Sequence, residues 1–300
     1  MKQEKSTISS IVLLRAIAAL AVCLAHIQMV INFKINKLVD YLFNQGNQGV
    51  AIFFVISGFI LPYSLYKKQY QLKDFFAFLL KRSIRVDPPY WASIVIAFIF
   101  TPISLALLNL KSIFLHLTYL VPFTKSADWY NGVYWTLSIE FQFYILLGLG
   151  YPLLKKLPNY LSILILIALS VFCLRYTVRG IIIADLFQFV FGYLAFMAYV
   201  KMIDMRKFII IFCLYTIYIV FTKSVISGVL PALTVLFIML YKSNKNIPVF
   251  TFLGNISYSL YLVHTPVIYL ILRLLNGYFT SLAIIFSSML ICFYISRLYI

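Results

Sequence analysis

Charged side chains are scarce in this sequence: Asp, Glu, Lys and Arg make up 11% of its 300 residues, while 63% are hydrophobic. So few polar residues cannot cover a soluble globule of this length, which excludes a soluble protein and places most of the chain in lipid. The apolar runs also lack the alternation of polar and apolar residues that a membrane barrel wall requires. Because a backbone in lipid must then satisfy its hydrogen bonds within helices, we predict an all-α, polytopic integral membrane protein.

Acidic residues are scarcer still, with 8 Asp and Glu against 25 Lys and Arg, which gives a net charge of +17. The basic residues cluster in short segments between the apolar runs, a distribution typical of loops that set membrane topology. We therefore expect the lipid bilayer as a partner and no binding of nucleic acid. The four cysteines lie inside apolar runs without CxxC spacing, so we expect neither a disulfide nor a metal site at Cys23, Cys173, Cys213 and Cys292.

The apolar runs divide the chain into about ten segments near the length of about 20 residues that crosses a bilayer. We predict about ten transmembrane helices, near residues 11–32, 49–66, 88–108, 133–154, 159–176, 183–200, 207–222, 224–241, 254–274 and 279–297. The two short spans around Lys223 could also form one long broken segment. No loop is long enough for a separate soluble domain, so we expect a single membrane-embedded domain over residues 1–300.

The loops between these spans indicate which helix ends face the cytoplasm. If the amino terminus is cytoplasmic, the inner segments hold 16 Lys and Arg residues and the outer segments hold 8, with Arg15 inside the first span. Such an excess of basic residues is typical of cytoplasmic loops. We therefore predict that both termini are cytoplasmic, which requires an even number of spans.

The first predicted span carries two ionisable residues, Arg15 and His26, on one face. Their offset of eleven residues corresponds to three helical turns plus about 20°, and to a rise of about 16 Å. We expect Arg15 near the cytoplasmic headgroups and His26 in the inner half or the middle of the span. Ionisable residues there are costly and mark functional sites. A core histidine bonded to a neighbouring helix and an arginine that snorkels to the interface are the alternatives.

A basic cluster that contains Arg82 and Arg85 precedes the third predicted span. On a helix these two residues, at i and i+3, project to one side. Two guanidinium groups so placed suit a phosphate or pyrophosphate, which arginine binds with paired hydrogen bonds. The alternative is an anchor to anionic lipid. Pairing of Asp87 with one of the arginines would weaken the cluster.

The fourth predicted span contains Glu140 within the stretch WTLSIEFQFY at Trp135–Tyr144. A carboxylate at this depth needs a partner, and the candidates are Arg15, His26 or an arginine of the inner cluster. A purely structural ion pair is the alternative to a functional role.

Two further apolar stretches contain small and polar residues. In the first, Gly49, Ser57 and Gly58 permit close approach of helices, so packing alone can explain them. In the second, the residue that ends GNISYSLYLVH, His264, is a candidate ligand of a second site. We nevertheless expect this histidine to be bonded to a neighbouring helix.

Taken together, these stretches resemble the acyltransferase-3 family of bacterial membrane acyltransferases, which O-acetylate cell-surface polysaccharides and other sugars. The resemblance spans nearly the whole chain. It depends on five motifs, each of which is weak evidence alone, whereas all five in the same order are strong evidence. The motifs are Arg-x10-His at Arg15 and His26, FFVISGF at Phe53–Phe59, RxxR at Arg82 and Arg85 followed by PPYW at Pro88–Trp91, WTLSIEFQFY at Trp135–Tyr144, and GNISYSLYLVH at Gly254–His264.

The resemblance implies an O-acetyltransferase of the bacterial inner membrane. Its donor substrate is acetyl-CoA or another acyl-CoA, used from the cytoplasmic side with no permanently bound cofactor, and its acceptor is a carbohydrate hydroxyl. The implied site residues are His26, Arg15 and Glu140 as catalytic, Arg82 and Arg85 as donor-binding, and Trp135 as substrate-binding. Many members have an acidic residue where this chain has Ala51, so any role of that carboxylate is unfilled here or supplied elsewhere.

The chemistry of acyl transfer agrees with these residue types. A base must deprotonate the acceptor hydroxyl, which suits histidine, and a donor must stabilise the oxyanion, which suits an arginine or a backbone N–H. A transporter or flippase for a polysaccharide or small solute would share the ten spans and the embedded charges. Such proteins usually show inverted repeats or paired broken helices, which this sequence lacks. A structural or sensory subunit would not need Arg15 and His26 on one face.

Overall fold

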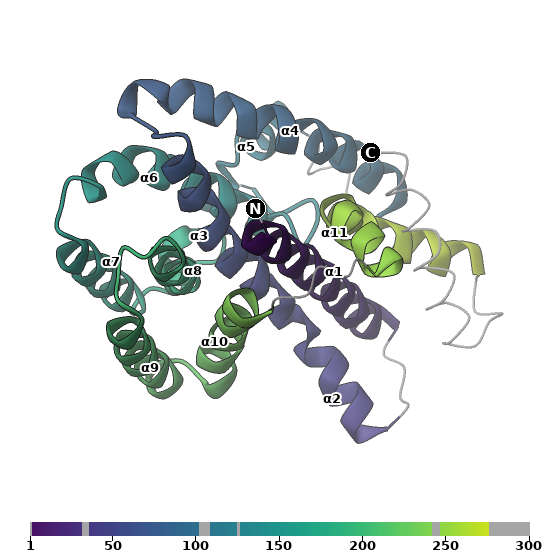
Figure 1. The fold of residues 1–300 in the computed structure, drawn as a ribbon. Helices are drawn as coiled ribbons and strands as arrows, with labels where there is room; N and C mark the ends of the chain where they lie inside the picture. Colours follow the sequence, from purple (N-terminus) through teal and green to yellow (C-terminus); the bar gives the residue numbers. More distant parts are fainter. Residues whose placement is uncertain (1, 32–35, 102–108, 125–126, 242–246, 276–300) are drawn as a thin grey trace. The chain divides into compact units, whose positions relative to one another are not determined.

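A computed structural model describes residues 2–31, 36–101, 109–124, 127–241 and 247–275. Within these ranges every regular element is helical, which confirms the all-α prediction (Figure 1). The α-helices are α1 (Lys2–Ile31), α2 (Lys37–Gln45), α3 (Gly49–Lys67), α4 (Phe75–Phe100), α5 (Leu110–Leu117), α6 (Trp135–Leu154), α7 (Asn159–Cys173), α8 (Leu186–Tyr199), α9 (Met205–Thr222), α10 (Val225–Leu240) and α11 (Pro248–Leu275). Single 3₁₀ turns lie at Gly46–Gln48, Leu72–Asp74, Val121–Phe123 and Ile182–Ala184.

The described residues include five helical segments that are long and apolar enough to cross a membrane, as a multi-pass membrane protein requires. These segments are Ser9–Val30, Lys37–Lys67, Trp135–Leu154, Met205–Thr222 and Pro248–Leu274. Three shorter apolar helices, α7, α8 and α10, match further predicted spans. The third predicted span begins inside α4, which starts at Phe75 and continues through Pro88 and Pro89. The predicted span at 279–297 lies outside the described residues.

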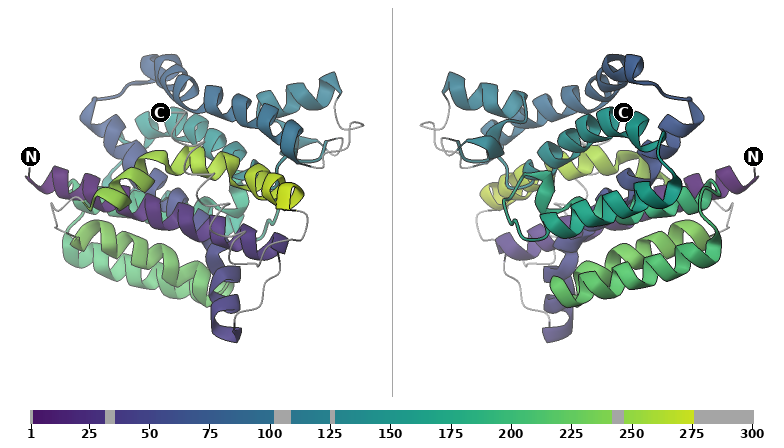
Figure 2. Two further views of the ribbon diagram at one scale, coloured as in Figure 1. Left: turned by 90° about the vertical axis from the view of Figure 1, so that its right-hand side faces the viewer. Right: turned by 90° about the vertical axis from the view of Figure 1, so that its left-hand side faces the viewer.

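The segment around Lys223 separates two helices. Helix α9 ends at Thr222, α10 begins at Val225, and the hydroxyl of Ser224 accepts a hydrogen bond from the backbone N–H of Ser227. This N-cap satisfies one of the backbone donors that the start of a new helix leaves open. The two helices then lie side by side in each view (Figures 1 and 2), so the close pair is not one broken segment.

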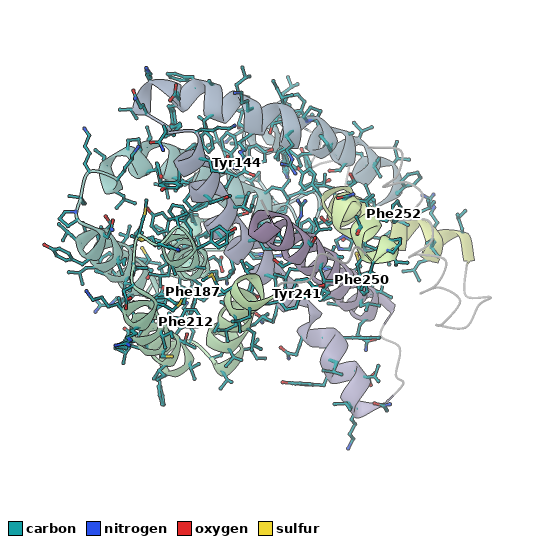
Figure 3. The ribbon with its side chains drawn as sticks, in the orientation of Figure 1. Tyr144, Phe187, Phe212, Tyr241, Phe250 and Phe252 are labelled. Carbon is teal, nitrogen blue, oxygen red and sulfur yellow. The ribbon has the colours of Figure 1, made fainter. Side chains whose placement is uncertain are left out.

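The chain divides into two compact units, each assembled from segments far apart in sequence. Unit 1 consists of Met1–Ile11, Ala51–Arg82 and Thr136–Lys245, and unit 2 consists of Val12–Val50, Ser83–Trp135 and Asn246–Ile300. In unit 1, α8 contacts α7, α9 and α10, and most of its side chains are buried. Phe187 of α8 and Phe212 of α9 both belong to this interior (Figure 3). Helix α8 is therefore the central helix of unit 1.

Two glycines allow α3 and α8 of unit 1 to approach each other closely. A Cβ atom at Gly58 would collide with the backbone of Phe189, and one at Gly192 would collide with the backbone of Val55. Beside this contact, the ring of Phe54 stacks on that of Phe189 with centroids 4.8 Å apart. The packing role expected for Gly58 is thus confirmed, since only the absence of a side chain lets the backbones meet.

In unit 2, α1 and α11 run parallel and in contact. Gly254 of α11 lies so close to the carbonyl of Val12 on α1 that a Cβ atom would not fit, and further along Ile27 packs against Ile268. Residue numbers rise together along the two helices, so both run in the same direction, as Figure 2 shows. The first and the last recognised motifs of the sequence therefore face each other.

The described cysteines are free thiols. Cys23 of α1 and Cys173 of α7 are buried, and Cys213 of α9 is exposed. Cys292 lies outside the described residues. In the described part of the chain, no group of three or more His, Cys, Asp or Glu side chains could hold a metal ion.

We expect Gly192→Ala to destabilise the folded chain, because the added methyl group collides with the backbone of α3. Overpacking of this kind costs about 1–3 kcal/mol. The midpoint of thermal aggregation in detergent measures the effect. Gly150→Ala is the control, since a Cβ atom at Gly150 of α6 has nothing within 4 Å and alanine is the better helix former. Equal midpoints for the two variants would contradict the close approach of α3 and α8.

Candidate functional site

Arg15 of α1 is held against α11 within unit 2. Its guanidinium Nε donates a hydrogen bond of 3.2 Å to Oγ of Ser257, and this hydroxyl donates to the carbonyl of Gly254 at 2.8 Å. The side chain is half-buried. This hydrogen bond orients the guanidinium against α11. Arg15 is therefore fixed within the unit, which a snorkelling side chain would not require.

His26 lies on α1 eleven residues after Arg15 and is also half-buried. Its Nδ1 lies 2.9 Å from the carbonyl oxygen of Val22, one turn earlier on the same helix. Because a carbonyl oxygen only accepts hydrogen bonds, the proton of the neutral ring is on Nδ1 and the lone pair is on Nε2. This is the protonation pattern that a general base requires.

The position of His26 along the span differs from the expectation. The apolar segment of α1 runs from Ser9 to Val30, so His26 lies seventeen residues from its beginning and four residues from its end. At 1.5 Å per residue the distance from Ser9 is about 26 Å, which is most of the thickness of the hydrocarbon, about 30 Å. The prediction of the inner half or the middle is wrong. Arg15 and His26 instead lie toward opposite ends of the span.

His264 of α11 lies next to His26 in unit 2. The two rings meet edge to face, with their centroids 4.9 Å apart and their planes at 64°. Nδ1 of His264 donates to the carbonyl of Tyr261 at 2.8 Å and, more weakly, to that of Leu260 at 3.3 Å. Both of these acceptors lie on the preceding turn of α11. Nδ1 therefore does not form the expected hydrogen bond to a neighbouring helix.

The same stretch of α11 binds two further segments of unit 2. The hydroxyl of Tyr258 donates to the carbonyl of Val86 at 2.8 Å, directly after Arg85 on α4. The hydroxyl of Tyr261 donates to the carbonyl of Val133 at 3.4 Å, two residues before Trp135. GNISYSLYLVH thus connects α11 to α1, to α4 and to the segment that precedes α6.

The two arginines of the basic cluster lie on α4, but their surroundings differ. The guanidinium of Arg82 lies over the rings of Phe78 and Tyr144, at 5.7 Å and 6.0 Å from the centroids, in unit 1. Tyr144 belongs to α6 (Figure 3). Arg85 is exposed. The two rings thus help to orient the guanidinium of Arg82, whereas the guanidinium of Arg85 is accessible.

Asp87 does not need an arginine as its partner. It accepts a hydrogen bond of 2.8 Å from the hydroxyl of Tyr119 in unit 2. Burial raises the pKa of Tyr119, and Tyr258 and Asp87 act in the same direction, so the hydroxyl stays protonated and remains a donor. This bond leaves Arg85 available to a ligand.

Glu140 lies on α6 and is half-buried. The hydroxyl of Ser57 on α3 donates to its carboxylate at 2.7 Å, a contact within unit 1. From the sequence we expected a cationic partner for this carboxylate and a packing role for Ser57. The hydrogen bond from the Ser57 hydroxyl was not predicted. Trp135 is the first residue of α6 and is half-buried, so the motif places the two residues on one helix.

Sequence reasoning missed the role of Gln142, which also lies in the motif on α6. Its amide nitrogen donates to the carbonyl of Gly180 at 2.7 Å, and its amide oxygen accepts from the backbone N–H of Ile182 at 3.0 Å. Gly180 has a φ of 86°, which glycine adopts without strain. The amide thus fixes the connection between α7 and α8 to the helix that carries Glu140. The sequence feature that could have indicated this role is a polar amide within an apolar span.

Sequence reasoning also missed His116 of α5, in the connection between α4 and α6. Nδ1 donates to the carbonyl of Ser112 at 2.8 Å, and Nε2 accepts from the backbone N–H of Tyr130 at 3.1 Å. The ring stacks on that of Tyr130 at 3.6 Å, and the hydroxyl of Tyr90 on α4 donates to the His116 carbonyl. In the neutral form of the ring, both nitrogens therefore form hydrogen bonds. His116 holds this connection together, and the bilayer-length runs gave no indication of it.

Comparison with known protein families identifies the class of this protein. The family model of the acyltransferase-3 family, described as an acyltransferase domain, matches residues 8–297, which is nearly the whole chain. The chain therefore belongs to this family and is a membrane acyltransferase. No curated protein and no solved structure matched the chain.

Protonation of His116 is expected to destabilise the protein. Burial lowers the pKa of His116 below its usual 6.5, and the hydrogen bond to Ser112 opposes part of this shift. Between the unfolded-state pKa of 6.5 and the lower folded-state pKa, the unfolded chain therefore binds more protons than the folded chain. The free energy of unfolding thus falls as the pH falls through this range. Thermal midpoints at pH 7 and pH 5 measure this loss. The titration-free variant His116→Gln should start from a lower midpoint and show a smaller decrease; an equal decrease would contradict the assignment.

Removal of the Ser57 hydroxyl is expected to impair Glu140. Ser57→Ala deletes the donor at 2.7 Å from the carboxylate, and a hydrogen bond to a charged group is worth about 1.5–3 kcal/mol. Acyl-transfer activity in membranes should fall about tenfold or more at equal protein abundance if the carboxylate acts in catalysis. Ser64→Ala on the same helix is the matched control and should retain activity. Equal activity of both variants would limit Ser57 to a packing role.

Proposed function

We propose that this membrane acyltransferase is an O-acetyltransferase. It transfers an acetyl group, or another acyl group, from acyl-CoA to a hydroxyl of a cell-surface sugar or polysaccharide. We further propose that it lies in the bacterial inner membrane with both termini in the cytoplasm. The excess of Lys and Arg in the inner segments supports this topology.

The proposal depends above all on the neutral, oriented imidazole of His26. Its Nδ1 is bound by the carbonyl of Val22, which leaves the lone pair of the neutral ring on Nε2. A base of this type suits a neutral hydroxyl acceptor, because its ordinary pKa lies near physiological pH. His26 lies toward the end of the span that faces outward in the proposed topology. That is the side on which a cell-surface sugar is found.

In the proposed reaction, Nε2 of His26 takes the proton of the acceptor hydroxyl while the oxygen attacks the thioester carbonyl of the donor. A C–O bond forms, and the carbonyl oxygen becomes an oxyanion that a guanidinium or a backbone N–H stabilises. The tetrahedral intermediate then breaks its C–S bond. His26 returns the proton to the leaving sulfur, so coenzyme A departs as the thiol and His26 is neutral again.

The donor phosphates would bind at α4. Arg85 is exposed, so it can present its guanidinium edge to a pyrophosphate, and the family motif RxxR assigns Arg82 to the same donor. The pantetheine arm would extend from there toward His26, past Arg15, over a length comparable with the rise of about 16 Å between these residues. We assign Glu140 to catalysis and Trp135 to substrate binding on the basis of the family motif that contains both.

The central test is His26→Gln in the purified full-length chain with radiolabelled acetyl-CoA. Glutamine retains a hydrogen-bonding amide but cannot accept a proton at neutral pH, so the release of the coenzyme A thiol should fall about 10²–10⁴-fold. Binding of acetyl-CoA should persist, because the arginines of α4 are unchanged. In cells, loss of the gene should remove O-acetyl groups from surface polysaccharide, and the His26→Gln gene should not restore them. A parent chain that neither binds nor cleaves acetyl-CoA would instead favour a transporter.

A second test concerns the donor site. Arg85→Lys keeps the charge but cannot form the bidentate hydrogen bonds of a guanidinium to a phosphate, so the Kd for acetyl-CoA should rise about tenfold. Titration of acetyl-CoA into the purified protein measures it. Arg175→Lys is the matched control, since Arg175 is also exposed but lies between α7 and α8. Unchanged affinity in Arg85→Lys would make this arginine a lipid anchor.

A further inference from the structure

Two consecutive residues of α11 each keep a polar atom without a partner in the interior of unit 2. His264 is 1% exposed and Thr265 is 9% exposed. Neither Nε2 of His264 nor Oγ1 of Thr265 has a hydrogen-bond partner among the residues that the structure describes. Buried polar atoms are nearly always paired, because an unpaired one costs free energy. Two such atoms on neighbouring residues therefore indicate a ligand that pairs them.

The hydrogen bonds around Thr265 explain why its hydroxyl has no partner on its own helix. In other helices of the described chain, threonine hydroxyls donate to the carbonyl four residues earlier, as those of Thr216, Thr222, Thr234 and Thr251 do. For Thr265 that carbonyl belongs to Tyr261, and it already accepts from Nδ1 of His264 at 2.8 Å. The carbonyl three residues earlier, that of Leu262, accepts from Nδ2 of Asn131 at 3.4 Å.

Pro266 explains why Asn131 bonds to this turn of α11. Proline has no N–H, so the carbonyl of Leu262, four residues earlier, loses its helical donor. Asn131 supplies a hydrogen bond to this carbonyl instead. In lipid, a proline within a helix is tolerated because neighbouring groups satisfy the freed carbonyl in this way. The polar groups of this turn thus pair with one another and with Asn131, whereas Nε2 of His264 and Oγ1 of Thr265 stay unpaired.

The hydrogen-bonding character of the two atoms limits the chemistry of the ligand. Nδ1 of His264 donates to carbonyls of its own helix, so the neutral ring presents only a lone pair at Nε2. The Thr265 hydroxyl can both donate and accept. The ligand must therefore bring a donor for Nε2 and can offer an oxygen to Oγ1. The hydroxyl groups of a sugar meet both requirements, whereas an ionised phosphate or carboxylate has no proton for Nε2.

This turn of α11 lies beside the proposed base. The ring of His264 meets that of His26 edge to face, with the centroids 4.9 Å apart. A hydroxyl that donates its proton to Nε2 of His264 cannot give the same proton to His26. The hydroxyl bound at His264 is therefore different from the hydroxyl that is acylated.

We propose that His264 and Thr265 form a binding site for the acceptor, in which they hold hydroxyl groups close to the one that is acylated. The acceptor class that fits is a polyol, namely a sugar with a further free hydroxyl near the acylated position. An alcohol with a single hydroxyl would leave both atoms unpaired. The inference rests on the proposed function, because it names the acceptor contacts at the site where His26 acts as the base.

Substitutions of Thr265 separate its hydroxyl from its shape. Valine keeps the branched shape without the hydroxyl, and serine keeps the hydroxyl. The purified full-length proteins are assayed for transfer of radiolabelled acetyl groups from acetyl-CoA to surface polysaccharide from cells in which the gene is deleted. Thr234→Val on α10 is the matched control, because the Thr234 hydroxyl is buried and already donates to the carbonyl of Leu230. Thermal midpoints in detergent are measured for every variant.

We expect Thr265→Val to lower kcat/KM for the polysaccharide about tenfold, the effect of one lost hydrogen bond. Thr265→Ser and Thr234→Val should stay close to the parent. In Thr265→Val, KM for acetyl-CoA should not change, nor should the release of coenzyme A thiol without polysaccharide. Its thermal midpoint should equal or exceed that of the parent, because valine removes a buried hydroxyl that has no partner in the protein.

Substitution of His264 tests the second contact. His264→Phe retains a ring but removes the lone pair, so kcat/KM for the polysaccharide should again fall about tenfold with KM for acetyl-CoA unchanged. If this variant does not fold, the comparison of Thr265→Val with Thr265→Ser still decides. Loss of thiol release without polysaccharide in His264→Phe, with activity retained in His26→Gln, would make His264 the base and overturn the proposal.

Two results for Thr265→Val would also overturn it. A kcat/KM for the polysaccharide equal to that of the parent would show that the hydroxyl does not contact the acceptor, and a lower thermal midpoint in the same protein would then indicate a buried structural water. A rise in KM for acetyl-CoA that matches the loss for the polysaccharide would assign the site to the donor.

The parent protein separates failure of the proposed function from failure of the acceptor site. If the parent transfers no acetyl group from acetyl-CoA to the polysaccharide, the proposed function fails and the acceptor site fails with it. If the parent is active and His26→Gln is inactive, while Thr265→Val is as active as the parent, the proposed function stands and only the acceptor site is lost.

Discussion

The close contact between α1 and α11 is the constraint on which the candidate site depends. Gly254 permits it, because any side chain there would push the helix away from the backbone of Val12. Once the backbones meet, Ser257 reaches Arg15 and His264 reaches His26. In lipid there is little hydrophobic driving force between helices, so close packing and polar contacts must hold them together. The same contact therefore both assembles this helix pair and orients its ionisable side chains.

Polar groups in unit 1 follow the same rule by different means. Glu140 receives the hydroxyl of Ser57, and Gln142 uses both ends of its amide on the connection between α7 and α8. Each of these hydrogen bonds is made with a hydroxyl or a backbone group. A polar side chain within an apolar helix needs hydrogen bonds to offset desolvation. The motif on α6 is thereby rigid around Glu140.

The basic cluster on α4 illustrates how one helix can connect a membrane surface with the interior. The helix begins at Phe75, before the arginines, and continues through Pro88 and Pro89 into the apolar stretch that follows. Tyr258 fixes the carbonyl of Val86 to α11, so the basic segment is held by the helix that also carries His264. This arrangement gives a physical link between the proposed donor site and the histidine pair, because a shared rigid helix positions both.

Several features follow from the sequence alone. The scarcity of charge and the length of the apolar runs predicted the all-α membrane fold, since only helices satisfy the backbone in lipid. The five ordered motifs predicted the acyltransferase family, which the match over residues 8–297 confirms. Helical spacing also placed Arg15 and His26 on one face. Such properties are local, because they depend on the order of residues and the geometry of a single helix.

Other features were decided only by the tertiary structure. Ser57 looked like a packing residue and proved to be a donor to Glu140, and His264 was expected to bond to another helix but uses its own helix for Nδ1 and meets His26 with its ring. No periodicity predicts which residue of a distant helix will lie opposite a given side chain. That pairing depends on where backbones can approach, which a few glycines determine, and on the register in which two helices then pack.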